Sequence, residues 1–148
     1  MAKNLQKIIL SNLLHNEQFT RKALPHIKVS YFEDEYVPVY KLILSFIGSY
    51  NKLPNPSALE IEFQQSDDVT RKDANEVVTL IKSLEEKEEV DEEWLTDSTE
   101  KWCKDRAVYL AIMESIHIID GKSKDRSDGA IPEILSDALG VSFDSNVG

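Results

Sequence analysis

The chain has 148 residues, enough for one domain of ordinary size, and its 41% hydrophobic and 30% charged residues indicate a folded protein rather than a disordered one. Seventeen basic against 27 acidic residues leave a net charge of -10, the wrong sign for a surface that grips nucleic acid through its phosphates. The charge is uneven, because residues 1–56 hold seven basic and four acidic residues (+3) and the remainder therefore carries -13. Two surfaces of different sign are expected.

The cysteine content and the lengths of the apolar runs indicate the type of cellular compartment. The single cysteine, Cys103, cannot form an internal disulfide, so nothing indicates an oxidising environment. No apolar stretch approaches the ~18 residues of a membrane span, and the N-terminus lacks a small-residue cleavage site after its apolar part. We expect a protein that is neither secreted nor inserted into a membrane.

The first half of the chain predicts short helices, since five glycines and five prolines are few for a turn-rich β architecture. A helix is expected over 4–15 with Asn4 as its N-cap, and a second over 16–24, ending before Pro25. A third begins at Pro38 and ends near residue 50. Apolar positions in steps of three and four make it a central core helix: Val39, Tyr40, Ile43, Phe46, Ile47 and Tyr50.

Capping signals predict the helices of the second half. Asn55 before Pro56 opens a short helix with Leu59, Ile61 and Phe63, and Thr70 with Asp73 resembles a capping box for the next one. The acidic run 85–93 is interpreted as a solvated connection. A long helix follows over about 91–120, ended by Gly121, and a last one runs from Pro132 to Gly140.

The predicted fold is therefore all-α, with a globular bundle of short helices over residues 1–88 and an αα-hairpin over 89–140. Residues 107–119 of the long helix are apolar nearly all round, and such a helix must be covered on more than one side. A stripe of Ile131, Ile134, Leu135 and Leu139 on the returning helix can cover one side only. The bundle or a neighbouring subunit covers the rest. The candidate oligomer interface comprises Val108, Tyr109, Ile112, Met113, Ile116 and Ile119.

No catalytic, cofactor or metal site is predicted. Gly121, Lys122 and Ser123 spell the end of a phosphate-binding loop, but Ile116 stands where the loop needs its first glycine, so a helix C-cap is the better interpretation. Calcium-loop spacing around Gly129 would require Lys124 as a ligand. The three histidines and Cys103 lack metal-ligand spacing, and no nucleophile motif is present.

The order of elements resembles the N-terminal domain of the DnaB-type replicative helicases. In the stretch from Ile9 to Phe63, the residues that carry the match are Tyr31, Phe32, Tyr40, Ile43 and Pro54. The C-terminal stretch GAIPEILSDALGVSFDSNVG is similar to the segment that leads from the collar into the motor of T-even-type phage helicases. It matches through Gly129, Ile131, Pro132, Ser142, Phe143, Asp144 and Ser145, and similar segments surround Trp94 and Leu95, and Arg106 and Ala107.

This resemblance implies a collar domain in a ring of six subunits that associate partly through αα-hairpins. Residues 141–148 would begin the linker to a RecA-like motor that this chain lacks, and ATP and Mg²⁺ would bind only in that motor. The implied partners are primase, the helicase loader and single-stranded DNA, which passes through the ring with little direct contact. The implied location is the cytoplasm of the infected bacterial host. An alternative is a free-standing acidic adaptor that inhibits a host DNA-binding protein, supported by the charge of -10 alone.

The isolated chain is expected neither to bind nor to hydrolyse ATP, because Ile116 replaces the glycine that would let the backbone wrap the phosphates. The melting temperature should be the same with and without Mg-ATP. Differential scanning fluorimetry at constant ionic strength checks this, and a saturable increase in melting temperature with nucleotide would contradict it.

Overall fold

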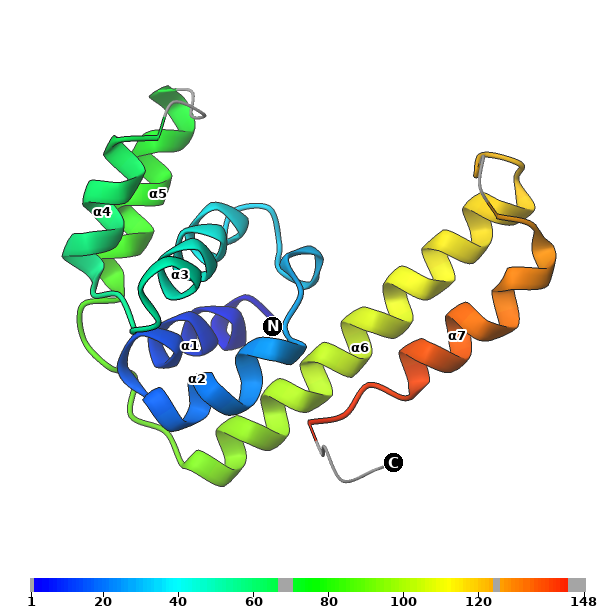
Figure 1. Cartoon of the computed structure of the whole chain (residues 1–148), viewed down its shortest axis with the longest axis horizontal. Coiled ribbons are helices and arrows are strands. Elements are labelled where there is room, and N and C mark those ends of the chain that lie inside the picture. Colours follow the sequence, from blue (N-terminus) through cyan, green and yellow to red (C-terminus); the bar gives the residue numbers. More distant parts are fainter. Residues whose placement is uncertain (1, 67–70, 124–125, 144–148) are drawn as a thin grey trace.

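The computed structural model describes residues 2–66, 71–123 and 126–143, and every regular element in these ranges is helical (Figure 1). The all-α prediction is confirmed. The α-helices are α1 (Ala2–His15), α2 (Glu17–Ala23), α3 (Val37–Tyr50), α4 (Pro56–Gln64), α5 (Arg71–Ser83), α6 (Glu92–Ile119) and α7 (Ile131–Leu139). Three short 3₁₀ turns join them: η1 (Leu24–His26), η2 (Val29–Tyr31) and η3 (Asp128–Ala130).

The helices form a globular body with one projecting arm. Helices α1 to α5 make the body, α6 runs along it and continues outward, and α7 returns beside the outer half of α6 (Figure 1). The core is centred on α1, whose apolar face is inaccessible to solvent, and on an aromatic group where the rings of Phe32 and Tyr40 lie 4.7 Å apart. The Tyr40 hydroxyl donates to the carbonyl of Ile27 over 2.7 Å, so this buried polar group is satisfied.

Local capping chemistry places most helix starts where the sequence predicts them. Asn16 accepts from the amide of Phe19 at the start of α2, Asn55 does the same for α4, and Asp91 accepts from Trp94 at the start of α6. Thr70, half of the predicted capping box, lies outside the described residues.

Two expectations in the first half were wrong. Asn4 is not an N-cap, because α1 already begins at Ala2 and Asn4 lies inside the helix. Tyr50 is not a core residue, since the last turn of α3 reaches the surface and leaves its side chain 58% exposed. Ile61 on α4 is likewise 55% exposed, so helical periodicity marked more apolar positions than the body covers.

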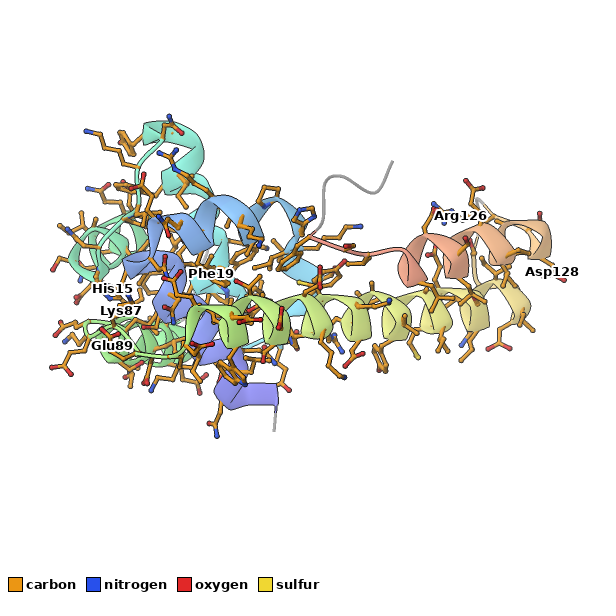
Figure 2. All side chains as sticks on the ribbon, turned by 90° about the horizontal axis from the view of Figure 1, so that it is seen from below. His15, Phe19, Lys87, Glu89, Arg126 and Asp128 are labelled. Carbon is orange, nitrogen blue, oxygen red and sulfur yellow. The ribbon has the colours of Figure 1, made fainter. Side chains whose placement is uncertain are left out.

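Buried polar side chains of α1 hold the acidic connection 85–91 against the body. Ser11 Oγ donates to the carbonyl of Glu86 (3.3 Å) and accepts from the amide of Glu88 (3.1 Å). Asn12 Nδ2 donates to the carbonyl of Glu88 (3.3 Å). Figure 2 places His15, Lys87 and Glu89 at the same end of the molecule. These bonds explain why α1 carries polar residues on a buried face, and they fix the backbone while its carboxylates stay in solvent.

Asn16 connects α2 to the start of α6, because its side-chain oxygen caps α2 and its Nδ2 donates to the Glu92 carboxylate over 2.9 Å. Replacing it with alanine should lower the free energy of unfolding by roughly 1–3 kcal/mol through loss of the cap and of a charge-assisted bond. Asn16→Asp keeps the cap but opposes two carboxylates. It should destabilise the protein at pH 7, because the new carboxylate faces that of Glu92.

Urea unfolding followed by circular dichroism measures these differences. Asn55→Ala, which removes a cap on the solvated side of α4, is the matched control and should cost about 1 kcal/mol. An Asn16→Asp variant as stable as the wild type at pH 7 would show that the contact with Glu92 contributes nothing.

Candidate interaction surface

The candidate surface lies on α6, a helix of 28 residues that serves both parts of the molecule. In its first half Leu95, Trp102 and Cys103 are buried in the core of the body. The Trp102 ring meets Tyr31 edge-on at 6.1 Å and lies 4.9 Å from Phe32. The predicted boundary between residues 88 and 89 therefore precedes a helix that both parts share, and the division into two subdomains stays a prediction.

One face of the second half of α6 packs on α7. Small residues at Ala111 and Ser115 are buried together with Ile118, and Ala138 is the buried residue of α7. Small side chains let the two helices approach closely. Leu139, which the sequence assigned to this covering stripe, is 59% exposed, because it lies at the edge of the apolar arc of α7. Only part of the returning helix's apolar face is used within the chain.

The other side of α6 carries apolar side chains that neither α7 nor the body covers. Their exposed fractions range from 37% to 67%, and their spacing of three and four places them on one side of the helix. We name them the hairpin stripe: Tyr109, Ile112, Met113, Ile116 and Ile119. Figure 2 shows side chains projecting from α6 on the side away from α7.

Five of the six residues predicted for the oligomer interface thus lie together on the hairpin stripe. Val108, the sixth, is partly buried at the edge of this face. The alternative that the body covers these residues does not hold for the stripe. Whether a neighbouring subunit covers it stays a prediction.

Arg106 ties the body to the beginning of the stripe. Its Nε donates to the carbonyl of Tyr31 in η2 over 2.8 Å, and its guanidinium lies 4.9 Å from the centre of the Tyr109 ring. A cation over an aromatic face is attracted by the ring quadrupole, so Arg106 holds both η2 and Tyr109 in place. Periodicity could not show this role, since an arginine in an amphipathic helix is usually solvated.

No protein-family model matches the chain. It is 34% identical over 151 aligned positions to the DnaB-like replicative helicase of Enterobacteria phage T4, and the match covers 96% of this chain. The resemblance to a phage DnaB-like replicative helicase is confirmed. The chain spans 31% of that helicase's length, so the similarity concerns a domain-sized part of the T4 protein.

The N-terminal residues that carry the resemblance to DnaB-type helicases are core residues. Tyr31, Phe32, Tyr40, Ile43 and Pro54 are all buried in the body. These five residues contribute to packing in the body, and their burial does not identify the residues that contact a partner.

The C-terminus of α6 is capped at Gly121, as the sequence predicts. Gly121 adopts a left-handed conformation (φ 72°), its amide donates to the carbonyl of Ile118, and the amide of Lys122 donates to His117 over 2.9 Å. This is the Schellman arrangement, so two amides of the GKS sequence satisfy helix carbonyls instead of pointing at an anion. Arg126 then pairs with Glu114 of α6 at 2.9 Å.

The chain returns to the body after α7, which the sequence did not predict. Phe143, assigned to the start of a linker, is only 6% exposed and stacks on His26 with 5.0 Å between ring centres. Its amide donates to the Glu100 carboxylate over 2.6 Å. Residues 141–143 are therefore anchored beside α6, while 144–148 lie outside the described residues.

The described residues hold neither a metal-ligand cluster nor a membrane-spanning helix. Within them, no group of three or more histidine, cysteine or carboxylate side chains is arranged to hold a metal ion. No helix in the described part of the chain is both long and apolar enough to cross a membrane. Burial, assisted by the nearby charge of Glu100, raises the pKa of the Cys103 thiol to about 12, and burial also raises the pKa of Tyr40.

Cys103 should be unreactive in the folded protein, since at pH 8 its thiol is protonated as well as buried. Labelling with Ellman's reagent should be slow in buffer and complete within minutes in urea. Because the folded pKa lies above the ordinary value of 9.0, the thiol's contribution to stability is full below pH 9 and is lost as the pH rises from 9 towards 12. Rapid labelling of the native protein at pH 8 would contradict this description of the site.

Proposed function

We propose that this chain is the N-terminal collar domain of a hexameric replicative DNA helicase and that it organises the ring. The match to the T4 helicase over almost the whole chain supports this assignment, and the remaining two thirds of the T4 protein leave ample length for a separate motor. The single observation that carries the proposal is the hairpin stripe, an apolar surface on an arm that projects from the body.

The hairpin stripe has the properties of a subunit contact. Soluble monomers seldom expose a contiguous apolar patch larger than a few hundred Å², and five large apolar side chains on one helix face approach or exceed that limit. Burying a fully exposed side chain of this size is worth roughly 1.5–3 kcal/mol, and these side chains are about half exposed, so each contributes roughly half of that value. Together the five gains are comparable with the several kcal/mol that association costs. A two-fold contact between two stripes is the simplest arrangement, because each copy then covers the other with the same surface.

The partners follow from the same assignment. In the proposed parent protein, ATP hydrolysis and unwinding belong to the motor, and the collar contacts primase and helps organise the helicase loader. Single-stranded DNA passes through the ring with little direct contact, which agrees with the net charge of -10. The protein would act in the cytoplasm of an infected bacterium, where phage DNA is replicated.

The isolated chain should self-associate, as a dimer or as a larger ring built from dimers, at micromolar concentration. Replacing Ile112 or Ile116 by aspartate places a charge in the contact and should give a monomer, because an unpaired carboxylate cannot be buried cheaply. Sedimentation equilibrium of the wild type and the two variants measures the effect, and circular dichroism verifies that the variants remain helical.

Ile61→Asp is the matched control, since Ile61 is exposed to a similar degree (55%) but lies on α4, away from the arm. This variant should associate like the wild type. A wild-type chain that stays strictly monomeric up to ~100 μM would reject assembly through the hairpin stripe, because association is expected at micromolar concentration.

A further inference from the structure

A second surface lies on the opposite side of the body, where α3, α4 and α5 meet. These three helices are grouped away from the projecting arm (Figure 1). Between them is a groove of about 970 Å³, formed by the first half of α3, the residues just before it, the C-terminal end of α4 and one turn of α5. This groove shares no residue with the hairpin stripe.

The floor of the groove is apolar. Phe63 from α4 and Val77 from α5 line the groove and are buried, with exposed fractions of 6% and 3%. Val37, Pro38 and Leu42 from α3 are partly buried along one wall. A partner with apolar side chains can therefore add to an existing core rather than rest on a flat surface.

The rim of the groove is acidic. The described lining residues hold four carboxylates and one ammonium group, a net charge of -3. Asp34, Glu62 and Glu76 come from three different segments, and all three are exposed, so they surround the apolar floor instead of pairing within one helix. Lys41 is the lining cation among the described residues.

The dimensions suit a short helix. The lining positions of α3 run from Val37 to Ser45, which at 1.5 Å per residue is about 12 Å, or two helical turns. Two apolar side chains one turn apart on a guest helix can reach a floor of this length, while flanking lysine or arginine residues meet the rim. Helix-in-groove recognition uses this combination of apolar anchors and complementary charge.

We propose that this groove docks a short basic amphipathic helix of a partner protein. The acidic rim disfavours nucleic acid, whose phosphates would face carboxylates, and it disfavours acidic segments for the same reason. The apolar floor favours an amphipathic helix over a chain that is only basic, because charge pairs at a solvent-exposed surface contribute little to binding by themselves. The inference does not depend on the helicase assignment or on assembly through the hairpin stripe.

The probe is a fluorescein-labelled synthetic peptide of about 14 residues with leucines at helical i, i+4 and i+7 positions and lysine or arginine elsewhere, titrated with the whole chain in fluorescence anisotropy. Two comparison peptides test the chemistry: one with the same residues in scrambled order, and one with glutamate in place of each basic residue. The amphipathic basic peptide should bind at least about tenfold more tightly than either.

Three variants of the chain locate the site. Glu62→Lys combined with Glu76→Lys reverses two rim charges and should weaken binding at least about tenfold. Glu93→Lys combined with Glu133→Lys makes the same change in net charge at exposed positions outside the groove and should leave binding within about twofold of the wild type. Ser45→Trp fills the groove without altering charge and should abolish binding while the melting temperature stays unchanged.

Amide chemical-shift mapping completes the test. With the basic amphipathic peptide, the shifts should concentrate at residues 34–45, 62–66 and 76–77. Equal loss of binding in the two double variants, equal binding of the scrambled peptide, or shifts centred on residues 109–119 would each overturn the proposal. So would a single-stranded oligonucleotide that perturbs the groove residues more strongly than the peptide does.

Discussion

The continuity of α6 is the constraint on which the rest of the structure depends. A single helix of 28 residues, about 42 Å long, has its first half packed along the body and its second half in the arm. The core of the body buries Leu95, Trp102 and Cys103, and this packing fixes the rotation of α6 about its own axis. Because the helix is continuous, the same rotation sets which way its outer half faces. The direction in which the hairpin stripe faces is therefore decided by packing in the body.

The contacts around this helix all restrain its position. Asn16 and the cap at Asp91 hold its start, Arg106 connects its middle to η2, and the amide of Phe143 donates to the Glu100 carboxylate. The arm itself has few long-range contacts apart from those between α6 and α7. An arm with few contacts to its own body is suited to form further contacts with another molecule.

The molecule separates two kinds of surface. The arm presents large apolar side chains with little charge among them, which favours association with a like surface. The groove on α3 to α5 combines an apolar floor with carboxylates, which favours a partner of opposite charge. The groove lies on α3 to α5 and the stripe lies on the projecting arm, so the two surfaces are separate (Figure 1).

Local chemistry in the sequence by itself determined the helices, because caps at Asn16, Asn55 and Asp91 and the stop at Gly121 act over a few residues. The apolar residues of α6 also predicted most of the candidate interface. Only the tertiary structure decided which apolar positions are covered: Tyr50, Ile61 and Leu139 follow helical periodicity yet lie at the surface. The groove and the return of Phe143 also join segments far apart in the chain. Periodicity reports that a helix has an apolar face, whereas burial depends on what packs against that face.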